Sequence, residues 1–196
     1  MCGIVGIYLK TKKFEKNLGR MLSGMLNNME SRGPDSAGFA IYKNEGNKIY
    51  KFSLCINNLN FNIFKKELSK KIKKTKLYQI SDHVILKTEE KPKKVLEILN
   101  LNFPEVSIVG YGKSIEIFKQ VGNPKDVVKK FKLGDFSGTH GIGHTRMATE
   151  SAITTDGSHP YSTGEDECLV HNGSLSNHNN LRRELTKKGN VFNSEN

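Results

Sequence analysis

The 196-residue sequence has no tryptophan, five prolines and three cysteines, and it contains no long uncharged apolar run. A membrane-spanning helix needs roughly 18 such residues or more, and the N-terminus has no basic segment leading into an apolar signal region. Cys2, Cys55 and Cys168 are odd in number, widely spaced and not arranged as CxxC. These absences exclude a membrane span, a disulfide framework and a zinc site, so we expect a cytoplasmic protein with reduced thiols.

The chain carries a formal net charge of +11, which raises the question of a nucleic-acid partner. The positive charge is nearly all lysine, and much of it lies between Lys65 and Lys94. No aromatic-rich RNA-binding motif accompanies it, and a run of lysines usually forms a solvated helix face. We therefore expect no nucleic-acid binding.

The pattern of apolar residues predicts a domain that mixes helices and strands. Strands are expected at 2–9, 39–42, 48–52, 83–86, 106–109, 115–121 and 167–173. Helices are expected at 18–29, 61–74, 92–99, 125–131 and 177–188. The second and third strands should pair as a hairpin, because the turn sequence NEGN lies between them. We expect Ser176 to cap the last helix and Gly189 to end it.

The region 57–136 differs from the rest of the chain. It is rich in lysine, and short helices alternate there with short strands, whereas glycine-rich apolar segments lie on either side. Such alternation is typical of a small α/β layer. We therefore expect a single domain over 1–196 that contains an α/β insertion at 57–136.

Cys2 is a candidate nucleophile because of its position. Methionine aminopeptidases remove Met1 when the next side chain is small, which leaves a thiol and a free α-amine on one residue. An α-amine has a pKa of about 7.7 to 8.0, so near neutrality a useful fraction takes up the thiol proton, directly or through water. Taken alone, however, Cys2 is explained better as part of an ordinary core strand.

Four short motifs follow one another along the chain: MCGIVG from Met1, RGPDSAG from Arg32, GHTRMAT from Gly143 and HNGSLSNHNNLRREL from His171. Their order and identity resemble those of class II glutamine amidotransferases, which use an N-terminal nucleophile (Ntn). The resemblance implies an α+β fold, the α/β/β/α sandwich of antiparallel sheets of Ntn hydrolases. No cofactor is expected, because the sequence has neither a phosphate-binding glycine loop nor a cluster of metal ligands.

The resemblance also implies roles for five residues. Cys2 becomes the nucleophile that attacks the side-chain amide of glutamine. Arg146 grips the α-carboxylate of glutamine with its planar fork of donors, and Thr149 joins it in binding the substrate. Asn172 and Gly173 form the oxyanion hole, and Gly173 also contacts the substrate. Without the motifs, Arg146 would be a surface arginine and Asn172-Gly173 an ordinary turn.

The other polar residues of the motifs are expected to support the site. Arg32, Gly33 and Asp35 should shape it, since RGPDSAG predicts a tight turn in which Asp35 bonds its own backbone. His144 and His171 are expected to be hydrogen-bonded core residues rather than catalytic groups.

The sequence also departs from the family pattern. Met147 and Glu150 stand where sugar-phosphate aminotransferases of the superfamily have an aromatic residue and a histidine, and with the insertion they resemble the amidotransferase subunit of archaeal-type glutamate synthases. In the family, an acidic motif that binds the α-ammonium of glutamine follows the last helix, whereas this chain ends at Asn196. We therefore expect a truncated, split or decayed domain that lacks much of the second sheet and has little activity alone.

The leading functional expectation is a glutaminase component that forms a thioester at Cys2 and delivers ammonia to a synthase partner, for glutamate synthesis. Its partners would be glutamine and a synthase subunit or the missing C-terminal polypeptide. Two alternatives stay open. One is the amidotransferase domain of a hexosamine- or asparagine-forming enzyme. The other is a non-catalytic binding or regulatory protein that uses its lysine-rich insertion against an acidic partner.

Overall fold

The computed structural model describes residues 2–44, 46, 48–148, 152–173 and 175–192. The strands are β1 (Gly3–Tyr8), β2 (Ser36–Tyr42), β3 (Tyr50–Cys55), β4 (Lys76–Ile80), β5 (His83–Thr88), β6 (Ser107–Gly112), β7 (Ile115–Val121), β8 (His140–Arg146), β9 (Tyr161–Gly164) and β10 (Glu167–Leu169). The helices are α1 (Leu18–Asn28), α2 (Phe61–Lys71), α3 (Pro92–Asn102), α4 (Pro124–Lys130) and α5 (His178–Lys187).

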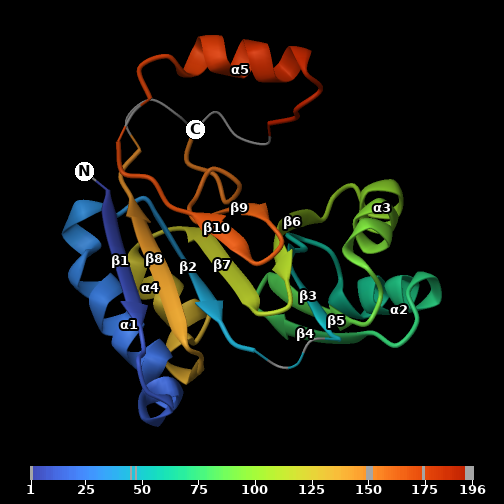
Figure 1. Cartoon of the computed structure of the whole chain (residues 1–196), viewed down its shortest axis with the longest axis horizontal. Helices are drawn as coiled ribbons and strands as arrows, with labels where there is room; N and C mark the ends of the chain where they lie inside the picture. The colour runs from blue at the N-terminus through green and yellow to red at the C-terminus, as the bar shows by residue number, and fades with distance from the viewer. Residues whose placement is uncertain (1, 45, 47, 149–151, 174, 193–196) are drawn as a thin grey trace.

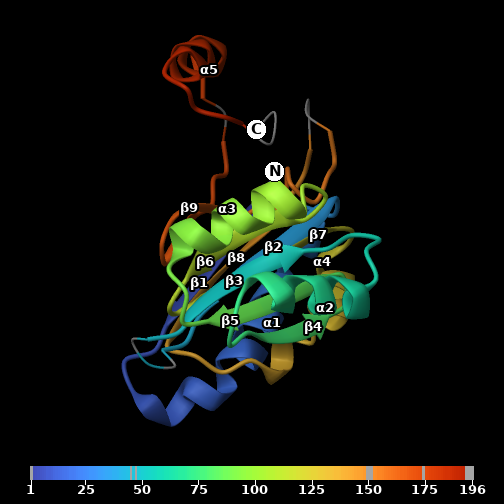
Figure 2. The same cartoon turned by 90° about the vertical axis from the view of Figure 1, so that its right-hand side faces the viewer.

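The strands form two four-stranded antiparallel sheets, with the order β1-β8-β2-β7 in the first and β4-β5-β3-β6 in the second. A short ribbon of β9 and β10 lies beside β6 (Figure 1). Helices α1 and α4 cover one face of the first sheet, and α2 and α3 cover one face of the second (Figures 1 and 2). The expected mixture of helices with antiparallel sheets is confirmed, while the full Ntn sandwich stays a prediction.

All the helices and strands that the apolar pattern predicts are present, although the strand expected at 167–173 ends at Leu169. Strands β4, β8 and β9 lie outside the predicted segments. The reason is clearest for β8, which is glycine-rich because α1 packs closely on it. A Cβ atom on Gly143 would lie 2.9 Å from the side chain of Leu26. Glycine there weakens the strand signal and permits the close approach of the helix.

The predicted hairpin of the second and third strands is wrong. Strand β2 pairs with β7 and β8, whereas β3 pairs with β5 and β6, so the chain crosses from one sheet to the other after Tyr42 (Figure 1). A turn sequence permits the chain to reverse, but pairing also needs neighbouring apolar faces that match. Here both strands find better partners far away in the sequence.

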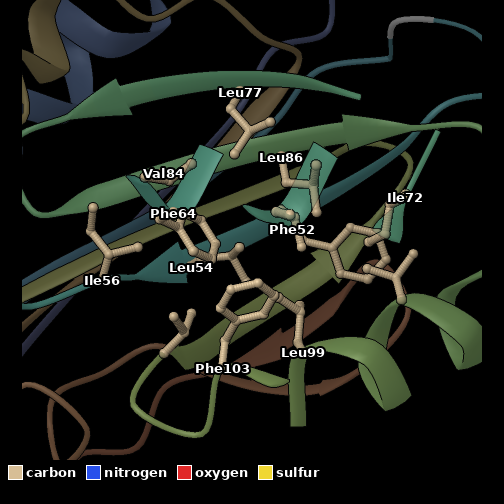
Figure 3. Close-up of a cluster of buried hydrophobic side chains, with 13 residues drawn as sticks. Phe52, Leu54, Ile56, Phe64, Ile72, Leu77, Val84, Leu86, Leu99 and Phe103 are labelled. Atoms are coloured by element: carbon tan, nitrogen blue, oxygen red, sulfur yellow. The ribbon is translucent and has the colours of Figure 1, made fainter. Parts of the chain in front are cut away.

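The region 57–136 does not form one separate layer. Strands β4, β5 and β6 join β3 and helices α2 and α3 around their own core, a buried cluster to which β3 contributes Phe52 and Leu54, α2 contributes Phe64 and α3 contributes Leu99 (Figure 3). Strand β7 and helix α4 instead belong to the first sheet and its helical cover. The interpretation of this region as an insertion within a single domain stays a prediction.

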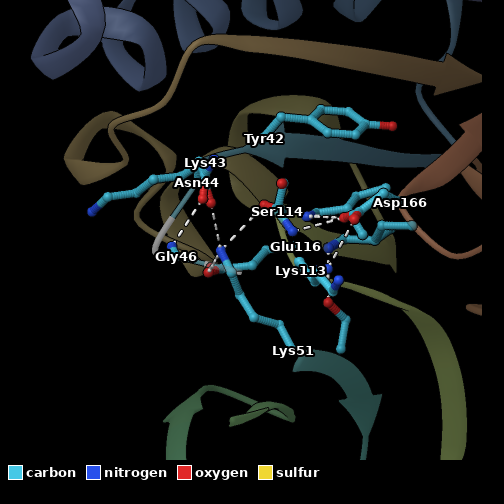
Figure 4. Close-up of polar contacts among 12 residues, drawn as sticks. Tyr42, Lys43, Asn44, Gly46, Lys51, Lys113, Ser114, Glu116 and Asp166 are labelled. Carbon is cyan, nitrogen blue, oxygen red and sulfur yellow. Dashed lines mark hydrogen bonds and ion pairs between the residues drawn. The ribbon is translucent and has the colours of Figure 1, made fainter. Parts of the chain in front are cut away.

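Two polar side chains of β3 cover the free edge of β7. Lys51 is fully buried, and its Nζ donates to three acceptors: the carbonyl oxygens of Lys43 (3.0 Å) and Ser114 (3.1 Å) and the carboxylate of Glu116 (2.9 Å) (Figure 4). The Ser53 hydroxyl accepts from the backbone N–H of Ile117 at 2.8 Å. An edge strand with unpaired backbone groups is a liability. Here Ser53 satisfies the N–H of Ile117 within β7, and Lys51 satisfies carbonyl groups just before β7 and just after β2.

Asp166, in the turn between β9 and β10, holds the connection between the two sheets. Its carboxylate accepts from three successive backbone N–H groups at the β6–β7 turn: Lys113 (3.0 Å), Ser114 (2.7 Å) and Ile115 (3.0 Å) (Figure 4). A carboxylate that accepts several backbone N–H bonds makes strong, charge-assisted contacts. The β9–β10 ribbon is therefore fixed to the junction of the two sheets.

Helix α5 stands apart from the sheets, and none of its residues is buried (Figure 1). Its N-cap is Asn177, which makes no side-chain capping bond, so the expected cap at Ser176 is wrong. Gly189 follows the helix with a φ of +87°, as expected for a glycine that ends a helix. Among the described residues, no helix combines the length and apolar character needed to cross a membrane.

The substitution Asp166→Asn tests whether Asp166 fixes the β9–β10 ribbon to the junction of the two sheets. Asn tolerates the positive φ of 59° at this position but replaces one acceptor oxygen with a donor. We expect a loss of roughly 1 to 3 kcal/mol in the free energy of unfolding, measured by urea denaturation. The matched variant Glu165→Gln, at an exposed neighbour, should change it by less than about 0.5 kcal/mol. Equal effects of the two variants would contradict the role of Asp166.

Candidate active site

The N-terminal end of β1 brings together residues from three distant parts of the chain. The Asn172 side-chain amide donates to the carbonyl oxygen of Cys2 at 2.9 Å. Arg32 donates to the same oxygen through Nε at 3.4 Å. The backbone N–H of Met147 donates to the Cys2 sulfur at 3.5 Å. Cys2 is therefore held by the segments that follow α1 and β10 at its carbonyl oxygen and by the segment that follows β8 at its sulfur.

The segment that carries Asn172 and Gly173 is tied to the core by His144. The Nε2 atom of His144 donates to the carbonyl oxygen of His171 at 2.9 Å, and the His144 ring is fully buried. The expectation that His144 is a hydrogen-bonded core residue is confirmed. His171 is instead exposed and contributes its backbone, so the core expectation is wrong for that residue.

Arg146 lies at the end of β8, opposite Ser36 of β2, and it is 4% exposed. Its Nη1 atom donates to the carbonyl oxygen of Ala152 at 3.1 Å. The predicted contact of Arg146 with the α-carboxylate of glutamine stays a prediction. Thr149, the other predicted substrate-binding residue, lies outside the described residues.

Asp35 holds the segment that follows β8. Its Oδ2 atom accepts from the backbone N–H of Ala148 at 2.7 Å, and its own N–H donates to the carbonyl oxygen of Arg146 at 3.1 Å. The structural role of Asp35 is thus as expected, but its partner is this distant segment and not its own backbone. Met147, which contacts Cys2, lies between the two residues that Asp35 holds.

Gly33 permits the close approach of the RGPDSAG loop to β8. A Cβ atom at this position would lie 2.4 Å from the carbonyl carbon of Thr145 and 2.6 Å from the nitrogen of Arg146. These are backbone atoms that cannot move away from a side chain. Any other residue at position 33 would therefore push the loop off the strand that carries Arg146.

A row of three residues crosses the first sheet next to the site. Gly38 of β2 pairs with His144 of β8 on one side and with Lys119 of β7 on the other. The loop 152–160 passes over this row, and a Cβ atom on Gly38 would lie 2.2 Å from the carbonyl oxygen of His159. Because side chains alternate along a strand, Arg146 lies on the same face as His144. The loop therefore covers the face of the sheet that carries Arg146.

His144 and His159 stack within this covered face, with ring centroids 4.2 Å apart. Burial lowers the pKa of His144 to about 4 and that of His159 to about 3. Both rings are therefore neutral at physiological pH, and a proton on either would meet the nearby charge of Arg146.

A group of possible metal ligands lies elsewhere, at one end of the second sheet. Cys55, Asp82 and His83 each offer an atom within 4.8 Å of the others. The Asp82 carboxylate is paired with Lys130 at 3.0 Å, and the Cys55 thiol donates to Asn57 at 3.2 Å. Although burial opposes it, the contacts with His83 and Lys130 hold the pKa of Asp82 below its usual range. A metal ion would have to displace the ammonium group, so the cluster is better explained as an ion-pair network.

A cavity of about 480 Å³ lies between the two sheets, far from Cys2. Its lining includes Ile41, Lys43 and Phe131. Ile41 and Lys43 lie at the C-terminal end of β2, whereas Ser36, which pairs with Arg146, begins the strand. Large cavities are the usual first guess for an active site, but this one contains none of the predicted site residues. The convergence of the motif residues at Cys2 is the stronger indication.

Two features of the site were not predicted from the sequence, namely the loop 152–160 and Lys119 beneath it. The loop is polar and gives no periodic signal. Lys119 does carry a signal, because Ile115, Ile117 and Lys119 alternate and should share one face of a strand. A lysine that continues an apolar row indicates a buried ammonium with a specific partner.

No protein-family model matches the chain. A glutamine amidotransferase-like protein, GlxB, of Rhizobium meliloti (strain 1021) is 48% identical over 199 residues, which span all of this chain and 66% of that protein. A protein of Methanothermobacter thermautotrophicus, provisionally named a glutamine amidotransferase, is 30% identical over 217 residues, covering all of this chain and 68% of the relative. The chain spans about two thirds of the length of these two relatives.

A third similarity is local. Glutamine–fructose-6-phosphate aminotransferase of Methanococcus maripaludis is 41% identical over 83 residues, which are 42% of this chain and 14% of that enzyme.

The histidine stack predicts how stability depends on pH. Unfolded histidines have a pKa of about 6.5, so below that pH the unfolded chain takes up two protons. The folded chain takes up the same protons only near pH 4 at His144 and near pH 3 at His159. Stability is therefore lost as the pH falls from about 6.5 to about 3, and at pH 5 the pair has lowered the free energy of unfolding by roughly 2 to 4 kcal/mol.

Thermal unfolding at pH 7 and pH 5 measures this loss. The variant His159→Gln should show a clearly smaller fall in Tm between the two pH values than the wild type. The exposed His178 offers a matched control, and His178→Gln should keep the full fall. If His159→Gln also kept the full fall, the buried histidines would not be its source.

Proposed function

The chain belongs to the glutamine amidotransferases, and on that premise we propose that Cys2 is the nucleophile of a class II enzyme that hydrolyses the side-chain amide of glutamine. The observation that supports this most strongly is the contact of Asn172 with Cys2. The two residues are 170 positions apart, yet the Asn172 amide lies 2.9 Å from the Cys2 carbonyl oxygen. A thiol and an amide donor at one strand end are the minimum that acyl transfer from an amide needs.

The proposed reaction begins after removal of Met1. The α-amine of Cys2 takes the thiol proton, and the sulfur attacks the side-chain carbonyl carbon of glutamine. The oxygen becomes negative in the tetrahedral intermediate, where the Asn172 amide and the Gly173 N–H donate to it. The carbon–nitrogen bond breaks, the nitrogen takes the proton from the α-amine, and ammonia leaves. Water then attacks the thioester, which releases glutamate and restores the thiol.

Substrate orientation is assigned to Arg146. A guanidinium binds a carboxylate through two parallel hydrogen bonds, and Arg146 already has one nitrogen within 3.1 Å of a carbonyl oxygen on the covering loop. Thr149 would add a second polar contact. The α-carboxylate of glutamine would replace the Ala152 carbonyl as the acceptor.

For the fate of the ammonia, we propose a synthase partner, with glutamate synthesis as the first candidate. The resemblance of Met147, Glu150 and the long insertion to the subunit of archaeal-type glutamate synthases supports it. The second candidate is the formation of an amino sugar, supported by the local similarity to the aminotransferase of Methanococcus maripaludis. Transfer of the amide nitrogen of glutamine to 2-oxoglutarate or to fructose 6-phosphate, measured with candidate partners present, would distinguish the two.

The nucleophile is tested by the intact mass of the purified chain before and after exposure to 6-diazo-5-oxo-L-norleucine, a glutamine-analogue electrophile. We expect loss of Met1 and a single adduct, which Cys2→Ala should lack. Cys168→Ala should keep the adduct, because burial raises the pKa of the Cys168 thiol and leaves less thiolate to react. A wild-type chain without Met1 that takes no adduct would contradict the proposal.

The oxyanion role is tested by Asn172→Ala. Removing one oxyanion donor typically costs about 100-fold to 1,000-fold in rate, and we expect a loss of that size in adduct formation or in glutaminase turnover. Asn102→Ala, at the end of α3, is the matched control and should react at the wild-type rate. A loss of less than about threefold for Asn172→Ala would exclude this side chain as an oxyanion donor.

A further inference from the structure

Lys119 is buried in an unusual way. Its side chain follows Ile115 and Ile117 on one face of β7, and the residue is 5% exposed. Its Nζ donates to the backbone carbonyl oxygens of Asp156 at 3.0 Å and Ser158 at 2.9 Å. No carboxylate within the described part of the chain lies at ion-pair distance from it.

A buried ammonium without a carboxylate partner is costly. Burial lowers the pKa of Lys119 to about 8, which shows that the surroundings disfavour the charge. An apolar side chain of similar length would fill the same space without that cost. The lysine is therefore best explained by what its ammonium holds in place.

Lys119 holds a compact turn. Within the turn, the backbone N–H of Gly157 donates to the Thr154 hydroxyl at 2.9 Å, and the N–H of Ser158 donates to the Thr155 carbonyl at 3.1 Å. Ser158 is fully buried, and its carbonyl oxygen accepts from the ammonium. The two carbonyl groups that Lys119 binds thus close the turn onto β7.

The same turn leads directly to Arg146. Ala152, whose carbonyl oxygen accepts from Arg146, lies four residues before Asp156. On the other side of the turn, His159 stacks on His144. The position of the turn therefore fixes both the loop segment that Arg146 contacts and the histidine pair beside it.

We propose that Lys119 is a positioning residue for glutamine binding: its ammonium anchors the 154–158 turn over the first sheet, which sets the loop that faces Arg146. This inference rests on the proposed function, because it assumes that Arg146 binds the substrate. Lys119 itself does not contact the reacting atoms. Loss of the anchor should lower the affinity for the substrate and leave the chemical step at Cys2 nearly unchanged.

The variant Lys119→Met keeps the length and removes the ammonium. Amide hydrogen exchange in 154–158 reports the anchor, and we expect it to become at least about tenfold faster. Labelling of Cys2 by 6-diazo-5-oxo-L-norleucine reports binding and chemistry separately. The half-saturating concentration should rise about tenfold, while the maximal labelling rate stays within about threefold. A purely structural defect would lower the maximal rate as well.

Two variants complete the comparison. Lys125→Met removes the same charge at an exposed site on α4, and it should match the wild type in both measurements. Lys119→Gln removes the charge but keeps an amide donor, so it should change both quantities in the same direction and by less. Lys119→Gln can replace Lys119→Met in both measurements if the methionine variant does not fold.

The outcomes separate this inference from the proposed function. Unchanged exchange in 154–158, or an unchanged half-saturating concentration, would overturn the role of Lys119. A fall in the maximal rate alone would overturn it too. A wild-type chain that takes no label would overturn both the proposed function and the role in substrate binding, whereas the exchange rates would still show whether Lys119 anchors the turn.

Discussion

The position of β8 between β1 and β2 is the constraint on which the candidate site depends. Its register places Thr145 opposite Gly3 and Arg146 opposite Ser36, so three distant segments of the chain meet at one end of these strands. A slip of one residue would turn Arg146 to the face that α1 covers. The glycines of β8 and Gly33 keep this register by allowing backbone and helix to approach closely.

Much of the fold follows from local sequence patterns, and the strand pairing does not. Apolar periodicity predicts α1 and β7 closely, because apolar residues recur at three- and four-residue spacing in the helix and at every second residue in the strand. The partners of β2 were not predictable from the same pattern, since they lie about 75 and 100 positions away and the nearby turn sequence favours the wrong strand. Pairing over such separations depends on complementary faces, which a single sequence does not show.

The candidate site, like the fold, was predicted only in part from the sequence. The motifs identify Cys2, Arg146 and Asn172, and the structure brings Cys2 and Asn172 into contact. The anchoring of the site was not predicted, because most of its partners are backbone groups. Asp35 binds the N–H of Ala148, and Lys119 binds two carbonyl oxygens. Every residue has a backbone N–H or carbonyl group, so the sequence does not mark which of them will be the partner.

The second sheet is connected to the site through the same loop. Gln120, next to Lys119 on β7, accepts from the Thr155 hydroxyl and donates to the Asp82 carboxylate at 2.6 Å. Asp82 lies in the turn between β4 and β5 and is also paired with Lys130. A displacement of the second sheet would therefore move a residue that bonds the loop over Arg146. The second sheet is thus joined by hydrogen bonds, through Asp82 and Gln120, to the loop that lies over Arg146.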